Sequence, residues 1–330
     1  MRIVIATGIY PPEIGGPAAY AKGVHEALTA RGFDAPVVLF SGLRKYPTGL
    51  RHVLYAIALL RAARHAHAII AFDTGSAGIP AALVARVLRI PLIIRIGGDF
   101  VWEMYMNRTQ DRVPLPLFYA AHKSLNLKER LAFALVRWML KHAELAFNTQ
   151  WLADIWMQPY RLSRERVHVV GNVIGERLPS TGDEPVMLLY GRDTAIKNTA
   201  AFRRAFERAR TEGVSLRLEE GRVPREEFLE RIRLGQSVAV PSVSEVAPNS
   251  VIDAIRCGKP FLLSKYSGYA ERFAQYGVIV DPLDEDSMVR GIKELADPAI
   301  YARLRSRIAE FKEMRTYDDV TREFLAILKL

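Results

Sequence analysis

The sequence contains a single cysteine, Cys257, among its 330 residues. One cysteine cannot form an internal disulfide, and its place in an apolar helical pattern predicts a small core residue. No apolar run approaches the roughly 18 residues that a membrane-spanning helix needs. The chain opens on the strand-like run Ile3-Val4-Ile5-Ala6 rather than on a charged leader, so we expect a cytoplasmic protein.

Several signatures of function are also missing. The seven histidines are scattered without metal-ligand spacing, so we expect neither a metal site nor a cofactor. Neither a Walker loop nor the three-glycine dinucleotide fingerprint occurs. The chain contains no recognisable nucleic-acid-binding module, so nucleic acid is not an expected partner.

Positive charge is concentrated in the first half of the chain. Residues 1–175 hold 21 of the 46 Lys and Arg but 11 of the 36 Asp and Glu, so they carry the whole net charge of +10. Within them, 50–67 and 125–142 combine basic and apolar residues at helical spacing. These helices either lie in an anionic membrane interface or are buried on one face and solvated on the other. A surplus that only keeps the protein soluble is a further explanation.

Strand-like runs alternate with helical patterns along the whole chain, which predicts an α/β protein with doubly wound parallel sheets. At this length we expect two domains joined by a polar linker at 179–185. The predicted limits are 1–175 and 176–300, and the helices of 301–330 then cross back to the first domain. The strand-like runs are 2–7, 35–39, 68–72, 91–96, 145–148, 167–170, 186–190, 215–218, 238–240, 260–263 and 277–280.

Ligands of such sheets bind beyond the carboxyl ends of the strands, so the loops 8–16, 73–78 and 97–103 should share one rim. Gly15 and Gly16 precede a helix that begins at Pro17, and without Cβ atoms their backbone lets a phosphate or sugar approach closely. A purely structural turn is the alternative. Asp99 follows Gly97-Gly98 on the same rim. The segment 107–129 lacks clean periodicity and is typical of a binding loop or lid.

The segment Asp73-Thr74-Gly75-Ser76 resembles the active-site signature of aspartic proteases. That chemistry needs two carboxylates that share a proton on a largely β scaffold. Here the motif occurs once, between a strand and a helix at 79–88. We therefore interpret it as a strand-end turn that starts the helix.

The second domain opens with a strand that ends in Gly191 and Arg192, and Lys197 follows before the next helix. Two cations beside a helix N-terminus suit a diphosphate, although ordinary surface charges give the same pattern.

Further along, Glu245 follows the strand 238–240, and a helix opening at Pro248-Asn249-Ser250 carries Asp253 in its first turn. Acids beside a helix N-terminus suit a phosphate-bearing ligand rich in hydroxyl groups.

Taken together, these motifs resemble the family 4 retaining glycosyltransferases. In that family the GT-B fold places two Rossmann-like domains face to face across a cleft, and the donor is a nucleotide-diphosphate sugar. The family signature of two acids separated by seven residues and followed by Gly-x-Pro is matched by Glu245, Asp253 and Gly258-Lys259-Pro260, with Asp in place of the second Glu. The remaining matches are Gly15-Gly16, the set Gly191, Arg192 and Lys197, and Ser267-Gly268-Tyr269-Ala270-Glu271.

The resemblance implies a role for each of these residues. Arg192 and Lys197 hold the diphosphate of a UDP- or GDP-linked donor, and Glu245 holds hydroxyl groups of its sugar. Asp253 reaches the ribose, although an Asp is one methylene shorter than the usual Glu. Because the chain has room for only one helix between 218 and 238, we expect the base contacts to come from 221–223, including Val223, or to be reduced. Asp99 is the residue expected to orient or assist the acceptor, because it follows Gly97-Gly98 on the rim of the first domain.

The implied acceptor is a glycan or a lipid-linked sugar in envelope polysaccharide or glycolipid synthesis, and the implied location is peripheral on the membrane, with no metal required. A nucleotide-sugar epimerase on the same fold is one alternative, disfavoured by the paired acids with the Gly-x-Pro step. A non-catalytic membrane or nucleic-acid binder is another, disfavoured because the basic residues and aromatics form no single patch.

Overall fold

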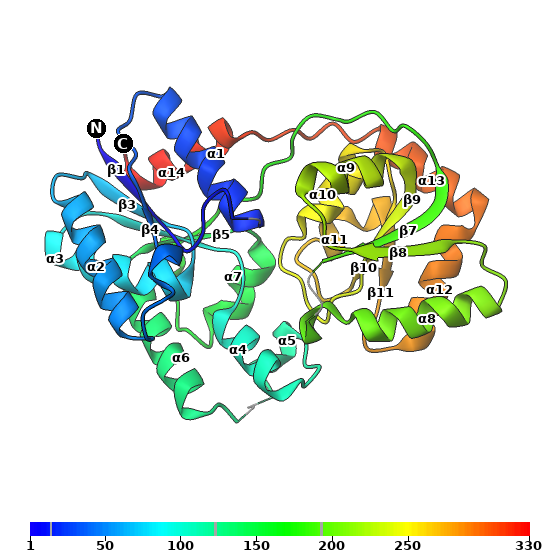
Figure 1. Cartoon of the computed structure of the whole chain (residues 1–330), viewed down its shortest axis with the longest axis horizontal. Helices are drawn as coiled ribbons and strands as arrows, with labels where there is room; N and C mark the ends of the chain where they lie inside the picture. The colour runs from blue at the N-terminus through cyan, green and yellow to red at the C-terminus, as the bar shows by residue number, and fades with distance from the viewer. Residues whose placement is uncertain (14, 122–123, 192–193) are drawn as a thin grey trace. The chain divides into compact units, whose positions relative to one another are not determined.

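The computed structural model describes residues 1–13, 15–121, 124–191 and 194–330. Contacts divide the chain into two compact units (Figure 1). The first comprises Met1–Val101, Ser124–Val173 and Arg315–Leu330, and the second comprises Trp102–Lys123 and Ile174–Met314. The segment from Trp102, which the sequence placed with the N-terminal domain, therefore belongs to the second unit.

The first unit is built on a six-stranded parallel sheet with the strand order β2-β1-β3-β4-β5-β6. Each strand coincides with a strand-like run of the sequence, because buried runs of Val, Ile, Leu and Ala favour strands covered on both faces. The strands are β1 (Ile3–Thr7), β2 (Val37–Leu39), β3 (Ala68–Ala71), β4 (Leu92–Ile96), β5 (Glu144–Phe147) and β6 (Val167–Val169).

The first and last helices of the chain pack together in the core of the first unit. Tyr20 and Val24 of α1 share one apolar cluster with Phe324 of α14. A Cβ at Gly23 of α1 would lie 2.3 Å from the ring of Tyr317, so this close approach requires glycine. The helices are α1 (Gly16–Ala30), α2 (Leu50–Ala63), α3 (Ile79–Leu88), α6 (Leu127–Leu140), α7 (Gln150–Met157) and α14 (Tyr317–Leu328).

The second unit is built on a five-stranded parallel sheet with the order β11-β10-β9-β7-β8. Side chains alternate between two clusters: Val238 and Val240 face one, and Ala239 faces the other. Both faces are therefore covered, as doubly wound sheets require. The strands are β7 (Glu184–Tyr190), β8 (Arg217–Gly221), β9 (Gly235–Val240), β10 (Phe261–Ser264) and β11 (Gly277–Val280).

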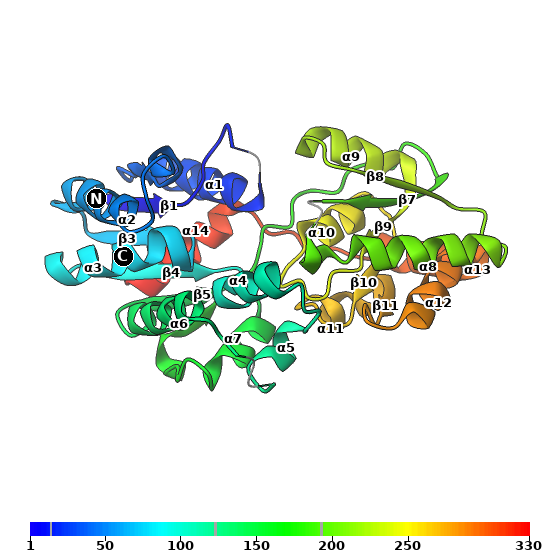
Figure 2. The same ribbon diagram turned by 60° about the horizontal axis from the view of Figure 1, so that its bottom comes forward.

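Helices of the second unit form a layer on each side of this sheet (Figure 2). One cluster joins Phe202 of α8 to Ile292 of α12, and the other joins Ile232 of α9 to Ile255 of α10. A single helix connects β8 to β9, as the short distance between these strands in the sequence predicts. The helices are α8 (Thr199–Thr211), α9 (Arg225–Leu234), α10 (Asn249–Arg256), α11 (Ala270–Phe273), α12 (Glu285–Ala296) and α13 (Pro298–Ala309).

Two segments differ from the sequence-based expectation. The loop expected over 97–103 is shorter, because α4 (Phe100–Thr109) begins inside it, and α5 (Leu115–Phe118) lies within the expected loop 107–129. The Trp102 indole donates to the carbonyl of Val113 at 2.9 Å, which folds the segment onto itself without helical periodicity. The helices expected over 301–330 also divide between the two units, because α13 belongs to the second unit and α14 to the first.

No helix in the described parts of the chain combines the length and apolar composition that crossing a bilayer requires.

Cys257 is buried, and burial raises the pKa of its thiol to about 11. The burial of Cys257 and the raised pKa of its thiol agree with the core role predicted for this cysteine.

The lysine of the Gly258-Lys259-Pro260 step fixes the start of the second unit. Lys259 is fully buried, and its ammonium group donates to the carbonyl of Gly182 and, at 2.7 Å, to Oδ1 of Asp183. Burial lowers the pKa of Lys259, and the Asp183 carboxylate opposes that shift. Gly258 allows the tight turn at the end of α10 with φ 72°.

We expect Asp183→Ala to lower the free energy of unfolding by about 2–3 kcal/mol, because it leaves a buried ammonium group without its carboxylate. Urea unfolding followed by circular dichroism measures the change. Asp286→Ala is the matched control: it removes an exposed ion pair with Arg208 and should change stability by less than about 1 kcal/mol. Equal losses in the two variants would contradict the buried-pair argument.

Candidate functional site

The strand order of the second sheet places a topological switch point between β7 and β9. The chain leaves β7 toward β8 on one side and returns to β9 on the other. Loops that follow two such strands diverge at the carboxyl edge and leave room for a ligand there. The segments that carry Lys197 and Glu245 follow β7 and β9, so both lie at this edge.

Asn198 holds the loops of this edge in place. It follows the short 3-10 turn η4 (Ala195–Lys197) and adopts a left-handed conformation with φ 56°. Its buried side-chain amide donates to the carbonyls of Pro241 at 3.2 Å and Pro282 at 2.8 Å. Three loops of the edge, after β7, β9 and β11, are therefore tied together by one side chain.

The centre of the candidate site is an ion pair between Lys197 and Glu245. The Lys197 ammonium group donates to Oε2 of Glu245, and the hydroxyl of Ser242 donates to the same oxygen at 3.2 Å. The two side chains keep 31% and 24% of their surface exposed, so both are accessible to a ligand. A cation and an anion thus stand side by side at the switch point.

The backbone holds Glu245 in position. Its N–H donates to the carbonyl of Tyr266 at 3.1 Å, and its carbonyl accepts from the N–H of Gly268 at 3.1 Å. Val243 adds a bond from its N–H to the carbonyl of Ile196 at 2.8 Å, which joins the loop of Glu245 to that of Lys197. The geometry of the ion pair is therefore set by the main chain.

The helix α10 begins just after Glu245. Pro248 is buried at its N-cap position, and Asn249 and Ser250 are half-buried in its first turn. The positive end of the helix dipole consequently lies at the same edge as Lys197, which favours an anionic ligand.

Asp253 occupies a different environment from the one the resemblance implies. The residue is only 1% exposed, and its Oδ1 accepts from Arg225 at 2.7 Å and from Arg256 at 3.2 Å. Burial raises the pKa of this carboxyl group, and the two guanidinium groups oppose the rise. The structure thus gives the buried carboxylate of Asp253 two arginine partners, and its contact with a ribose stays a prediction.

The remaining predicted residues of the second unit lie along the same edge where the structure describes them. Gly191 directly follows β7, and its N–H donates to the carbonyl of Gly221 at 3.0 Å, which joins it to the end of β8. Val223, half-buried, follows that strand. Arg192, the second predicted cation, lies outside the described residues.

In the first unit, Gly15 and Gly16 stand at the start of α1, which follows the loop after β1. The order β2-β1-β3 places a switch point between β1 and β3, and Gly8 after β1 lies against Asp73 after β3. Asp73 Oδ1 accepts from the N–H of Ala77 at 2.8 Å. This contact starts the π-helical turn η2 (Thr74–Gly78) and confirms the helix-starting interpretation of Asp73.

Asp99 lies in the interior of the first unit. It is 0% exposed, and its Oδ2 accepts from the indole N–H of Trp156 at 2.8 Å. The carboxylate thereby anchors α7, and its predicted part in orienting the acceptor stays a prediction.

Sequence reasoning missed three residues of the site. Asn198 had one usable signal, because Asn is among the few non-glycine residues that tolerate the left-handed conformation. Ser242, three residues before Glu245, and Arg225 at the start of α9 gave none. The contact of Arg225 with Asp253 joins segments 28 residues apart, and the contact of Ser242 with Glu245 depends on the conformation of the loop after β9.

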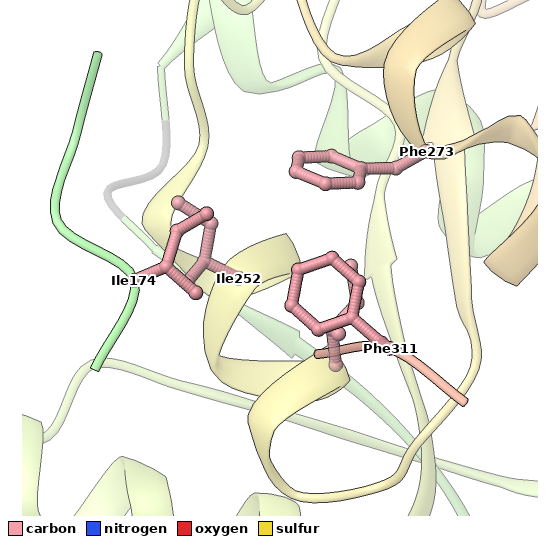
Figure 3. A pocket seen from close by; sticks show the side chains of 5 residues that line it. Ile174, Ile252, Phe273 and Phe311 are labelled. Carbon is pink, nitrogen blue, oxygen red and sulfur yellow. The ribbon is translucent and has the colours of Figure 1, made fainter. Parts of the chain in front are cut away.

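A separate apolar gap lies on the inner side of α10 (Figure 3). Its walls carry only apolar side chains, so it offers a sugar or a diphosphate no hydrogen bond. The lining residues are Ile174, Ile252, Ile255, Phe273 and Phe311. Among the described residues, no group of three His, Cys, Asp or Glu side chains is placed to hold a metal ion.

Solved structures with a similar fold include glycosyltransferases and a sucrose-phosphate synthase. Sucrose-phosphate synthase from Thermosynechococcus elongatus has a TM-score of 0.70 at 15% identity, covering 99% of this chain and 98% of its own. Anabaena Alr3699/HepE in complex with UDP-glucose has a TM-score of 0.68 at 14% identity, covering 100% and 99%. WaaG, a glycosyltransferase of lipopolysaccharide biosynthesis, has a TM-score of 0.66 at 14% identity, covering 99% of both chains.

The chain has the GT-B fold. Residues 220–312 match the family model of glycosyl transferases group 1, and this region contains Glu245, the start of α10 and Asp253. A comparison of the sequence with curated proteins finds no match. The predicted fold class and the resemblance to GT-B glycosyltransferases are therefore confirmed, while the assignment to family 4 stays a prediction.

We expect Asp99→Ala to lower the free energy of unfolding by about 1–3 kcal/mol, because the buried indole N–H of Trp156 loses its acceptor. Asp99→Asn keeps an acceptor oxygen and should lose less. Urea unfolding of both variants measures the difference. Wild-type stability in Asp99→Ala would show that the contact contributes nothing.

Proposed function

We propose that this GT-B protein is a retaining glycosyltransferase that moves a sugar from a nucleotide-diphosphate donor to a hydroxyl group of a glycan or lipid-linked acceptor. The observation that carries the proposal is the accessible Lys197–Glu245 pair at the switch point, with Glu245 inside the group 1 glycosyltransferase region.

Each partner of the pair suits one part of a nucleotide sugar. Cleavage of the bond between sugar and phosphate builds negative charge on the departing diphosphate, and a fixed cation stabilises that charge. Lys197 supplies the cation, and the first turn of α10 supplies backbone dipole. Glu245 accepts hydrogen bonds from sugar hydroxyl groups. Arg192, outside the described residues, adds a second cation on the basis of the sequence.

Without a donor, Lys197 and Glu245 neutralise each other. The donor replaces this one pair by two sets of contacts, phosphate oxygens on Lys197 and hydroxyl groups on Glu245. Because the two groups are already adjacent, the ligand must bring an anion and hydroxyl groups close together. A sugar bonded to a diphosphate meets that requirement.

The proposed reaction forms the bond between the acceptor oxygen and the anomeric carbon on the face that the diphosphate leaves. The leaving diphosphate takes the proton of the acceptor hydroxyl group, so no protein base is assigned. UDP-linked sugars are the first donors to test, since HepE has been solved with UDP and with UDP-glucose. GDP-linked sugars remain the second class.

The proposed acceptor is lipid-linked, and the proposed location is peripheral on the cytoplasmic face of a membrane. Its support is an apolar stripe on α6: Leu127, Leu131 and Leu135 are 82%, 59% and 39% exposed, one turn apart. Exposed Lys128 and Arg130 lie beside it. A basic helix with exposed leucines suits an anionic lipid surface. The WaaG and WaaB structures, both of lipopolysaccharide glycosyltransferases, share the fold.

We expect Lys197→Ala to lower the rate of sugar transfer by roughly 10²- to 10³-fold, the usual loss when one electrostatic donor is removed. Glu245→Gln should also lose activity, because its sugar contacts weaken. Transfer from UDP- and GDP-sugars, preceded by a thermal-shift screen for the donor, measures the effect. Lys293→Ala, which removes a lysine of similar exposure on α12, is the matched control.

Unchanged activity in Lys197→Ala would refute the role assigned to the Lys197–Glu245 pair. Consumption of the donor without an acceptor, giving an epimerised nucleotide sugar, would instead identify an epimerase. If no nucleotide sugar stabilises the parent protein, the donor assignment itself fails.

We further expect the protein to bind phosphatidylglycerol vesicles, and Leu127→Ser/Leu131→Ser/Leu135→Ser to reduce binding about tenfold or more, because apolar side chains leave the interface. Vesicle co-sedimentation measures the bound fraction. Leu283→Ser/Met314→Ser, two exposed apolar residues of the second unit, is the control. Full binding by the triple variant would refute this membrane surface.

A further inference from the structure

The buried carboxylate of Asp253 connects two arginines that have different surroundings. Arg256 is enclosed, with its side chain 15% exposed and its Nε donating to the carbonyl of Glu176 at 2.8 Å. Its guanidinium group also packs against Gly175. Arg256 therefore serves the structure at the start of the second unit.

Arg225 is open to solvent. Its side chain is 44% exposed at the start of α9, and its Nη2 donates to Asp253 at 2.7 Å. Within the described residues Asp253 is its one hydrogen-bonding partner, so further N–H groups of the guanidinium remain available. One end of Arg225 is fixed by a buried carboxylate while the other end faces outward.

The order of the strands gives this arginine a place in the donor site. Glu245 follows β9, Lys197 follows β7, and Arg225 follows β8, and the sheet arranges these strands as β9-β7-β8. The parts of a nucleotide sugar follow the same sequence: sugar, diphosphate, nucleoside. The register pairs Tyr190 with Gly221, so the turns after β7 and β8 are neighbours.

The acid at position 253 is poorly placed for the ribose contact that the resemblance implies. Asp253 is 1% exposed, and its Oδ1 already accepts hydrogen bonds from two guanidinium groups. Freeing that carboxylate for a sugar would leave two arginine charges without their shared partner, a costly change in a buried site. The accessible group of this cluster is the guanidinium of Arg225.

We propose that Arg225 contacts the ribose of the donor nucleotide, with its N–H groups donating to the ribose hydroxyl oxygens, and that Asp253 is the positioning residue that holds it. The inference rests on the proposed nucleotide-sugar function and specifies its nucleoside end. It also accounts for an Asp at position 253, since the shorter side chain keeps the carboxylate in the interior while Arg225 spans the distance to the ligand.

The test compares UDP with 2′-deoxyuridine diphosphate by isothermal titration calorimetry. We expect the parent protein to bind UDP about tenfold more tightly, the effect of one lost hydrogen bond to a charged group. In Arg225→Gln this preference should fall to within about twofold. If the screen selects a guanine donor, GDP and its 2′-deoxy form replace this pair. Arg231→Gln, on the same helix, is the control and should keep the parent's preference.

The outcomes separate the two proposals. If the parent protein binds neither nucleotide, the proposed function fails. If Arg225→Gln binds UDP more weakly but keeps its preference over the 2′-deoxy form, the arginine binds phosphate or base and the ribose assignment is overturned. The ribose assignment is also overturned if Arg225→Gln binds UDP and its 2′-deoxy form with the same affinities as the parent protein.

The positioning role of Asp253 is tested with Asp253→Asn, which preserves the shape but removes the charge that holds Arg225. We expect the preference for UDP over the 2′-deoxy form to fall at least threefold. The urea midpoint is measured in parallel, and addition of Arg225→Gln to a folded Asp253→Asn protein should cause little further loss. An unchanged preference in folded Asp253→Asn would refute the positioning role.

Discussion

The ion pair between Lys197 and Glu245 is the contact on which the candidate site of the second unit depends. These two charges of opposite sign lie at a partly exposed edge, and the main chain beside each of them is fixed. Lys197 belongs to the turn that ends at Asn198, and the backbone of Glu245 forms hydrogen bonds with Tyr266 and Gly268. Their mutual attraction offsets the cost of keeping charges beside a buried sheet. The donor then exchanges one pair for two complementary contacts.

The surroundings of this pair separate structural from ligand-facing charges. Lys259 and Arg256 are enclosed and bind main-chain carbonyls of 176–182, which fixes the start of the unit. Lys197 and Arg225 keep a substantial part of their surface exposed. Exposure combined with a fixed partner is the property that suits a cation for recognising a ligand, because little further ordering is required on binding.

Much of the fold could be predicted from the sequence, because strands buried on both faces read as continuous apolar runs separated by helical periodicity. The place of Glu245 and Lys197 at one sheet edge could be predicted as well, since each follows a strand end; their roles toward a ligand stay predictions. The loop expected over 107–129 was wrong in part. There the short helices α4 and α5 are stabilised by contacts such as that of Trp102 with Val113, which leave no period in the sequence.

By itself, then, the sequence determined the two parallel sheets, the helix starts near Pro17 and Asn249, and the residues that follow each strand, because these depend on local pattern and turn chemistry. Only the tertiary structure decided which charges meet. The pairing of Asp253 with Arg225 joins residues 28 positions apart, and Lys259 with Asp183 joins residues 76 apart. Such pairs depend on the strand order β10-β9-β7-β8 and on burial, which spacing along the chain does not encode.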